Sequence, residues 1–332
     1  MTGPLTARPL DPARSPDASP KLVTVIGGGG FIGRYVCEAL LRQGVRLRVA
    51  QRDVRAAYFL QPLAAVGQLG FVATSLTNRA SLDRACDGAT AVINLVGILK
   101  GKFDAIHVEG ARHAAEAATT AGASAFVQVS AIGADPASPS AYGRSKAQGE
   151  AAVRAAFPTA TIIRPSLVFG REDQLTNRFA QMARLPFLPV IAGATKFQPV
   201  YVADLAQAIA AAALDPASHG GKIYEIGGPE VMTMRALNEC IAALAGQSPE
   251  IAPVPDFVAE LLAKFGFLPG APLTRDQWAM LQTDNIVAPG TLGLDAFGIT
   301  PTPLAAVAPA WLDRFRKGGR FAPRKTDTSA SL

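Results

Sequence analysis

Hydrophobic positions in the first half of the chain form short, nearly continuous runs, and the segments between them carry apolar residues at helical spacing. Such runs are typical of strands buried on both faces of a parallel sheet. The runs are LVTVIG (22–27), RLRVA (46–50), LGFVAT (69–74), AVINLVG (91–97), AFVQVS (125–130) and ATIIRP (160–165), and the helix-like segments are 31–43, 54–66, 78–87, 103–121 and 142–156. The alternation predicts an α/β fold, a Rossmann-type doubly wound parallel sheet with one ligand-binding edge.

The pattern divides the chain into four parts. We expect a flexible segment over 1–20, a nucleotide-binding Rossmann domain over 21–165, a smaller irregular region over 166–321 that completes the fold, and a flexible tail over 322–332. In the irregular region, Asp204 is expected to cap one helix. A second helix is expected over 234–245, between a Thr233 cap and Gly246.

Composition limits the classes of function. Apolar residues make up 49% of the chain and charged residues 17%, which excludes a disordered chain. Asp104, His107 and Glu109 are interpreted as solvated helix residues, and no metal site is expected. Three separated cysteines indicate a reducing compartment and no disulfide framework: Cys37, Cys86 and Cys240.

The net charge of +6 is concentrated near the C-terminus. The basic residues there are Arg314, Arg316, Lys317, Arg320, Arg324 and Lys325, against Asp313 and Asp327. We interpret this end as a solvated tail, with attraction to an anionic partner or membrane surface as the alternative. No nucleic-acid partner is expected.

Gly27, Gly30 and Gly33 follow the first strand and open the first helix with the spacing GxxGxxG. The first glycine permits positive φ, the second lets the backbone approach a pyrophosphate, and the third allows the helix to pack closely. The helix that starts with Phe31 and Ile32 offers free N–H groups to phosphates. This strand–loop–helix context predicts a dinucleotide site.

The second strand favours NADP(H) over NAD(H). Gln51 stands where an NAD site usually has an acidic residue, and Arg52 follows it, while Arg34 comes directly after the last glycine. Two guanidinium groups beside the ribose suit a 2′-phosphate. The alternative is that Arg52 pairs with Asp53 or Asp83 and that Arg34 is solvated.

Tyr142 and Lys146 lie at i, i+4 on one face of a predicted helix. A nearby ammonium, together with the positive charge of an oxidised nicotinamide, would lower the pKa of the tyrosine towards working pH. Tyr142 could then exchange a proton with a substrate hydroxyl, and Lys146 could bind the nicotinamide ribose.

The chain resembles the short-chain dehydrogenase/reductase superfamily, on its atypical, epimerase-like branch. The stretches that carry this resemblance are GGGGFIGR, VINLVG, VQVS, YGRSK, IIRPSLVFG, PVYVADLAQAI and YEIGGPEVMT. A narrower resemblance, to the NADPH-binding accessory subunits of respiratory complex I, rests on RPSLVFGREDQLTNRFA, QPVYVADLA, LTRDQWAMLQTDN and GITPTPLAAVAPAWLDRFRKGGRF. Together the similarity runs from about residue 21 to 321.

The resemblance implies further site positions. Ser75 and Leu76 stand where the superfamily has an adenine-contacting Asp, Val96 and Gly97 would pass the adenine ribose, and Pro165 would lie by the nicotinamide. Ser130 is either the superfamily's catalytic serine or its structural neighbour. In the second case the apolar pair Ala131–Ile132 stands where the oxyanion partner belongs, which weakens the case for turnover.

One helical face carries Phe257, Leu261, Phe265 and Leu268. We interpret it as a core face, with docking on a partner or membrane surface as the alternative.

Two functions are consistent with the sequence. The first is a cofactor-holding accessory subunit bound to peripheral-arm subunits of complex I near the membrane, on the cytoplasmic face of a bacterial inner membrane or on the matrix side of a mitochondrion. The second is a free NADPH-dependent oxidoreductase or epimerase that acts on a small carbonyl or nucleotide-sugar substrate. The C-terminal resemblance favours the first, and the Tyr142–Lys146 pair keeps the second open.

Overall fold

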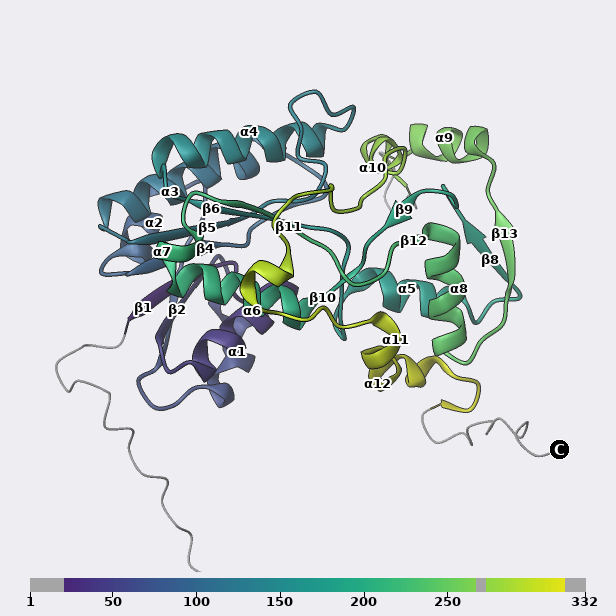
Figure 1. Ribbon diagram of the computed structural model, residues 1–332, viewed down its shortest axis with the longest axis horizontal. Helices are drawn as coiled ribbons and strands as arrows, with labels where there is room; N and C mark the ends of the chain where they lie inside the picture. Colours follow the sequence, from purple (N-terminus) through teal and green to yellow (C-terminus); the bar gives the residue numbers. More distant parts are fainter. Residues whose placement is uncertain (1–20, 267–272, 320–332) are drawn as a thin grey trace, which may run out of the picture.

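A computed structural model describes residues 21–266 and 273–319. Its centre is a seven-stranded, wholly parallel sheet in the order β11-β6-β5-β4-β1-β2-β3 (Figure 1). The strands of this sheet are β1 (Leu22–Ile26), β2 (Arg46–Gln51), β3 (Leu69–Ala73), β4 (Ala91–Asn94), β5 (Ala125–Val129), β6 (Thr161–Pro165) and β11 (Ile223–Ile226). The predicted Rossmann-type fold is confirmed, and all six predicted strands of the first half are present.

Helices cover both faces of the sheet (Figure 1). One face carries α1 (Phe31–Arg42) and α6 (Val202–Leu214), and the other carries α2 (Arg79–Cys86), α3 (Gly110–Thr120) and α4 (Ala141–Ala156). The remaining segments of this half are the 3-10 helix η1 (Val54–Leu63), the π-helix η2 (Asp104–Glu109) and α7 (Pro216–His219). The helix-like segments of the sequence are therefore helical, although two of them contain non-α turns.

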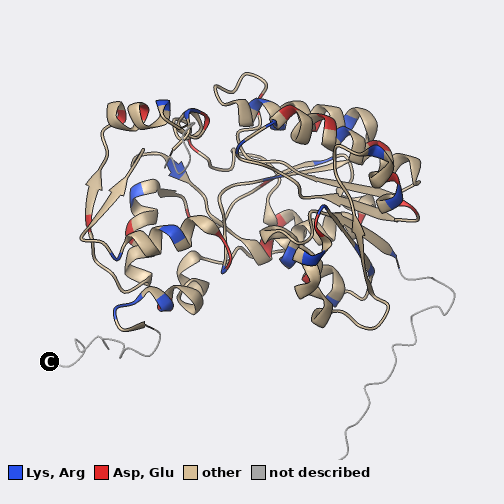
Figure 2. Ribbon diagram, turned by 180° about the vertical axis from the view of Figure 1, so that it is seen from behind, with Lys and Arg blue, Asp and Glu red and all other residues tan. Residues whose placement is uncertain are grey.

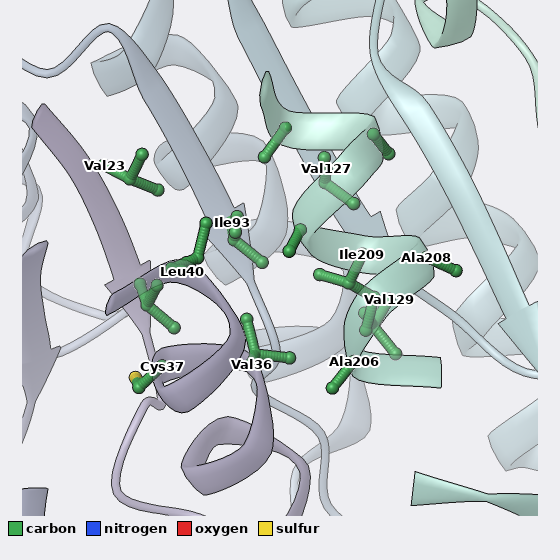
Figure 3. Packing of buried hydrophobic residues seen from close by; sticks show 14 of the residues in the cluster. Val23, Val36, Cys37, Leu40, Ile93, Val127, Val129, Ala206, Ala208 and Ile209 are labelled. Carbon is green, nitrogen blue, oxygen red and sulfur yellow. The ribbon is translucent and has the colours of Figure 1, made fainter. Parts of the chain in front are cut away.

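Tight packing of small and branched apolar side chains holds α1 and α6 against the sheet (Figure 3). Leu40 of α1 and Ile209 of α6 lie over Ile93 of β4 and Val127 of β5, and all four are fully buried. Helix α6 is rich in alanine, which lets its backbone approach both α1 and β5 closely. Because α6 and β11 come after residue 165, the later part of the chain completes the nucleotide-binding layer.

A second lobe lies beside the strand carboxyl ends, on the right of Figure 1. Its helices are α5 (Gln174–Met182), α8 (Met234–Leu244), α9 (Asp256–Lys264), α10 (Arg275–Met280), α11 (Leu304–Val307) and α12 (Pro309–Leu312), with the 3-10 turn η4 (Asp313–Phe315). Another 3-10 turn, η3 (Leu294–Phe297), packs against α6. Three two-stranded ribbons complete the described chain: β7 (Val168–Phe169) with β10 (Val200–Tyr201), β9 (Lys196–Phe197) with β12 (Met232–Thr233), and β8 (Phe187–Val190) with β13 (Glu250–Pro253).

The two helix ends expected in this lobe differ in outcome. Thr233 accepts a hydrogen bond from the N–H of Ala236 and caps α8, as predicted, and Gly246 follows the helix with a φ of +63°. The cap expected at Asp204 is wrong, because the N-cap of α6 is Tyr201, three residues earlier, and Asp204 lies in the first turn of the helix. The Asp204 carboxylate instead accepts hydrogen bonds from the backbone N–H and the hydroxyl of Thr302.

Helix α9 turns its large apolar side chains outward. Phe257 is 73% exposed, Leu261 54% and Phe265 52%, while the small residues Ala259 and Ala263 face the protein. The interpretation of this face as core is therefore wrong for the described residues, and Leu268 lies outside them. Among residues 21–266 and 273–319, no helix is both long and apolar enough to span a bilayer.

Charged positions lie mainly on helices and loops, and the central strands carry few of them (Figure 2). At the basic end, Arg314 donates a hydrogen bond to the side-chain oxygen of Asn177, and Arg316 pairs with Asp313. The predicted flexible segments at 1–20 and 322–332 lie outside the described residues, and so do Arg320, Arg324 and Lys325.

Candidate cofactor site

The glycine loop joins β1 to α1 with the geometry that a nucleotide-binding loop requires. Gly27 has a φ of +86°, so the expected positive φ at the first glycine is confirmed. A Cβ on Gly33 would lie 2.5 Å from the carbonyl oxygen of Gly27, which means that any side chain there would separate the helix from the loop. No side chain caps α1 at Gly30, and the first-turn N–H groups of Phe31 and Ile32 remain available to an anion.

A hollow of about 510 Å³ lies between this loop and the end of β2. The side-chain oxygen of Gln51 accepts a hydrogen bond from the N–H of Gly29 at 2.7 Å, and the Gln51 amide donates to the carbonyl of Asp53. Arg52 is exposed and lines the hollow. The hollow is lined by Gly29, Gly30, Gln51, Arg52, Asp53 and Ala56. The pairings considered for Arg52 do not form, since Asp53 caps η1 and Asp83 pairs with Arg79.

Arg34 does not line this hollow. Its guanidinium pairs with Glu172 at 3.1 Å and stacks on the ring of Phe59, 4.0 Å from the ring centroid. Tyr35 donates a second hydrogen bond to Glu172 at 2.7 Å. Arg34 is therefore half-buried and paired with the loop before α5, so the alternative that it is merely solvated is wrong. Its contact with a 2′-phosphate stays a prediction.

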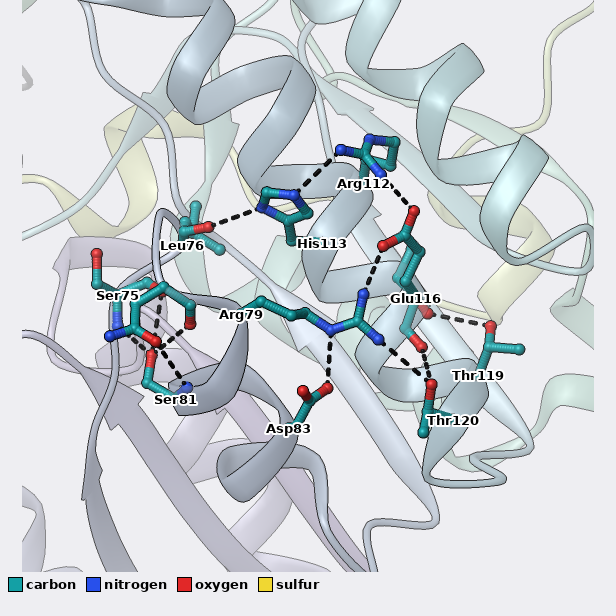
Figure 4. Close-up of polar contacts among 12 residues, drawn as sticks. Ser75, Leu76, Arg79, Ser81, Asp83, Arg112, His113, Glu116, Thr119 and Thr120 are labelled. Atoms are coloured by element: carbon teal, nitrogen blue, oxygen red, sulfur yellow. Dashed lines mark hydrogen bonds and ion pairs between the residues drawn. The ribbon is translucent and has the colours of Figure 1, made fainter.

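Ser75 and Leu76 follow β3 as expected, but neither offers a carboxylate-like contact. The Ser75 hydroxyl faces Thr77 at 2.9 Å, and the Leu76 side chain is buried between α2 and α3. Arg79 joins these helices by pairing with Asp83 and Glu116 (Figure 4). The loop after β3 is therefore fixed in place, but Ser75 and Leu76 have no carboxylate that could contact an adenine.

Val96 and Gly97 lie between the glycine loop and α4. A Cβ on Gly27 would lie 3.1 Å from a methyl carbon of Val96, and a Cβ on Gly97 would lie 3.2 Å from Nζ of Lys146. Gly97 is exposed. The carboxyl end of β4 thus brings the glycine loop and the Tyr142–Lys146 helix to the same edge of the sheet.

Tyr142 and Lys146 lie on the first turns of α4, whose N-cap is Ser140. The Nζ atom of Lys146 donates to the carbonyl of Val129 at 3.3 Å and lies 5.7 Å from the centroid of the Tyr142 ring. Burial lowers the pKa of Lys146 to about 8, against an opposing effect of Glu150, and burial raises the pKa of Tyr142 to about 12. The expected lowering of the tyrosine pKa is therefore absent in the protein alone.

His107 is buried, so its interpretation as a solvated residue is wrong. Its Nε2 accepts a hydrogen bond from the N–H of Ile98 at 3.0 Å, which leaves Nδ1 to donate to the Ser145 hydroxyl at 2.9 Å. Burial and the nearby Lys146 lower the pKa of His107 to about 3. A neutral His107 thus ties the loop after β4 to α4. The π-helical turn η2 carries His107, and such turns are frequent at functional sites.

Ser130 follows β5, and its hydroxyl is buried without a hydrogen-bond partner among the described residues. The backbone N–H of Ser130 donates to the carbonyl of Ile163, and that of Ile132 donates to the carbonyl of Pro165, the last residue of β6. Ser130 and Pro165 thus lie on neighbouring strand ends at the ligand edge. The choice between a catalytic and a structural Ser130 stays open.

Two residues of the second lobe complete this edge and had not been identified from the sequence. The carboxylate of Asp276 on α10 accepts hydrogen bonds from the N–H groups of Ala141 and Tyr142, at 2.6 and 3.2 Å, and from the Ser140 hydroxyl. Asn285 accepts a hydrogen bond from the Ser166 hydroxyl at 2.7 Å and donates to the carbonyl of Ile132. Both lie in LTRDQWAMLQTDN, one of the stretches that carry the resemblance to the complex I accessory subunits. That resemblance was the signal that could have identified them.

The described residues contain no group of three or more His, Cys, Asp or Glu side chains arranged to hold a metal ion.

Comparison with known proteins gives matches along most of the chain. A profile described as NAD dependent epimerase/dehydratase family matches residues 23–227. The chain is 34% identical over 316 residues to the mitochondrial NADH dehydrogenase (ubiquinone) 1 alpha subcomplex subunit 9 of Arabidopsis thaliana, covering 90% of this chain and 79% of that protein. For the Mus musculus protein of the same name the identity is 35%, with 85% and 77% covered.

A ceramide reductase of Caulobacter vibrioides is 37% identical over 195 residues, which is 57% of this chain and 60% of that protein.

Solved structures share the fold at lower identity. The NADPH-dependent quinone oxidoreductase QOR2 of Escherichia coli, complexed with NADPH, has a TM-score of 0.71 at 21% identity, with 87% of this chain and 99% of that chain covered. The UDP-glucose 4-epimerase of Thermus thermophilus, in complex with NAD, has a TM-score of 0.64 at 21% identity, with 89% and 98% covered.

Proposed function

The chain belongs to the NAD-dependent epimerase/dehydratase family, and from this premise we propose that it is an NADPH-binding accessory subunit of respiratory complex I with little or no turnover of its own. Support for the complex I role comes from relatives that bear the name of a complex I subunit and match about nine-tenths of this chain. At this coverage the similarity includes most of the second lobe.

One observation carries the low-turnover part of the proposal. The segment 274–285 is bonded to the edge of the sheet where a substrate would meet Tyr142: Asp276 holds the start of α4, and Asn285 joins Ser166 to the chain after Ser130. In the protein without cofactor, burial also raises the pKa of Tyr142 to about 12. These contacts favour stable packing over the access that catalysis needs.

The residues at the glycine loop fit a dinucleotide. The start of α1 has no side-chain cap, so its N–H groups are available to a pyrophosphate. Gly33 has no side chain, which allows the helix to start close to the loop. Arg52, which faces the hollow and has no ion pair among the described residues, would hold a 2′-phosphate. Lys146 would bind the nicotinamide ribose. A bound nicotinamide cofactor would supply a hydride, but here its main effect would be to stabilise the folded state by mass action.

We also propose that the subunit touches the membrane surface through α9. Its outward face carries Phe257, Leu261 and Phe265, and burying the exposed part of each would contribute roughly 1–2 kcal/mol. In a bacterium this would place the protein on the cytoplasmic side of the inner membrane, and in a mitochondrion on the matrix side.

The alternative is a free NADPH-dependent oxidoreductase or epimerase. It is favoured by the paired Tyr142 and Lys146, by the unpartnered Ser130 hydroxyl nearby, and by the 37% identity to a ceramide reductase. In this reading Ser130 would bond the substrate oxygen and Tyr142 would exchange its proton.

Isolation from native membranes decides between the two. A tagged chain expressed at its natural level should migrate with NADH dehydrogenase activity on a native gel and retain NADPH through purification. A chain that is found apart from the complex, and that oxidises NADPH with a ketone, aldehyde or nucleotide sugar, would establish the alternative.

A further inference from the structure

A second hollow, of about 720 Å³, opens between α5 and η4. It shares no lining residue with the hollow at the glycine loop. Four arginines line it: Arg171, Arg178, Arg184 and Arg314. Two carboxylates, Glu172 and Asp173, lie in the same wall. The net charge of the hollow depends on which of these six side chains already form ion pairs or hydrogen bonds with other residues.

Both carboxylates are committed elsewhere. Glu172 accepts hydrogen bonds from Arg34 and Tyr35 on α1. Asp173 is buried and caps α5, accepting from the N–H groups of Gly170 and Thr176 at 3.0 and 2.6 Å. Neither carboxylate forms an ion pair with an arginine of the hollow. Four guanidinium groups thus outnumber two carboxylates, of which Glu172 is already paired with Arg34, so the hollow has a net positive charge.

The arginines of the hollow differ from four arginines on other helices. Arg42, Arg79, Arg112 and Arg235 each pair with an acid three or four residues away. In contrast, Arg171, Arg178 and Arg184 are exposed and have no ion pair with another described residue. Arg314 donates to the neutral Asn177 at 2.6 Å and stacks on Phe315, 4.8 Å from the ring centroid. Its guanidinium is thus oriented without being neutralised.

We propose that this α5–η4 hollow binds a ligand that carries two or more phosphate groups. Guanidinium groups form bidentate, charge-assisted bonds to phosphate, and several unneutralised guanidinium groups around one concavity suit adjacent phosphates better than a single carboxylate. The volume fits a molecule of this size. Either a soluble polyphosphate or a lipid headgroup with two phosphates supplies this chemistry. The site is separate from the proposed NADPH site and does not depend on it.

Calorimetric titration with inorganic tripolyphosphate, with and without NADPH, tests the site. The Arg178→Gln/Arg184→Gln variant should bind at least about tenfold more weakly than wild type. The matched control is Arg46→Gln/Arg154→Gln, which removes two exposed arginines outside the hollow. This control should bind within about twofold of wild type, because the lost charges are remote. An equal loss in both variants, or the absence of saturable binding, would overturn the proposal.

Flotation with vesicles separates the two sources. Phosphatidylcholine vesicles that contain diphosphatidylglycerol are compared with vesicles that contain phosphatidylglycerol at equal charge. If the hollow variant loses binding to the first alone, the ligand is the headgroup. If tripolyphosphate binds the hollow and the variant leaves flotation unchanged, the ligand is a soluble polyphosphate. Competition by an acidic peptide as strong as that by tripolyphosphate would contradict phosphate recognition, because it would mean that the hollow responds to charge alone.

Discussion

The side-chain oxygen of Gln51 lies 2.7 Å from the backbone nitrogen of Gly29 and accepts its hydrogen bond. The residue at the end of β2 thus holds the glycine loop, in the place where an acid would otherwise bind a ribose. A neutral amide there does not repel a 2′-phosphate. Arg52, the next residue, faces the same hollow as Gly30.

From this arrangement we expect NADPH to bind more tightly than NADH and Arg52→Ala to remove the preference. Loss of one charge-assisted phosphate contact should weaken NADPH binding by about 1.5–3 kcal/mol and leave NADH binding nearly unchanged. Arg55→Ala is the control, since Arg55 is exposed nearby but does not line the hollow. Fluorescence titration of both cofactors measures the effect. Equal affinity of wild type for the two cofactors would contradict the assignment.

Replacing Asp276 should loosen the attachment of the second lobe to α4. Asp276→Ala leaves the N–H groups of Ala141 and Tyr142 without their acceptor, and we expect a loss of about 1–2 kcal/mol of unfolding free energy. Glu239→Ala, which removes an exposed i, i+4 pair with Arg235, should cost under about 0.5 kcal/mol. Urea unfolding of both variants gives the comparison, and similar losses would show that Asp276 has no special role.

The buried Lys146 should make stability depend on pH. Its pKa is about 8 in the folded protein and keeps its ordinary value of 10.5 when the chain unfolds. Between these values the unfolded chain binds a proton that the folded chain does not, so stability rises with pH in this window. The unfolding free energy of wild type, relative to Lys146→Met, should increase by about 2–3 kcal/mol from about pH 8 to about pH 10. A difference that stays constant with pH would refute the lowered pKa.

Helix α9 should bind membranes through its exposed side chains. Phe257→Asp/Phe265→Asp should reduce flotation with anionic vesicles by about tenfold or more, because two aromatic rings lose their place in the headgroup region. The melting temperature should stay close to that of wild type, since both positions are exposed. Val231→Asp alters a residue that is 53% exposed outside α9 and serves as the control. Unchanged flotation of the double variant would locate membrane contact elsewhere.

Local patterns predicted much of the fold and site. The strands, the glycine loop, the Thr233 cap and the i, i+4 placement of Tyr142 and Lys146 all follow from residues close together in the sequence. These features depend on backbone geometry and periodicity, which a short stretch of sequence determines.

Contacts between distant segments could not be predicted in the same way. Arg34 pairs with Glu172, 138 positions away, and Asp276 reaches α4 from 135 positions away. His107 was misjudged because its burial depends on a π-helical turn, which composition does not indicate. For α9, periodicity identified the apolar face of Phe257 and Leu261, but it could not tell whether another element covers that face.

We infer that the cofactor is held for structure and not for reaction. Gly30 has a φ of −78°, which valine can adopt, and a Cβ there would lie 3.3 Å from the carbonyl oxygen of Gly27, in the space that a pyrophosphate needs. Gly30→Val should therefore fold but fail to keep NADPH. Tyr142→Phe removes only the hydroxyl that a reaction would use.

The most direct test is the fraction of each variant that is assembled into complex I, measured on native gels of membranes. We predict that Tyr142→Phe assembles like wild type, whereas Gly30→Val assembles poorly and has a lower melting temperature than wild type with NADPH bound. The contrary result would be normal assembly of Gly30→Val without cofactor, together with loss of a robust NADPH oxidation in Tyr142→Phe.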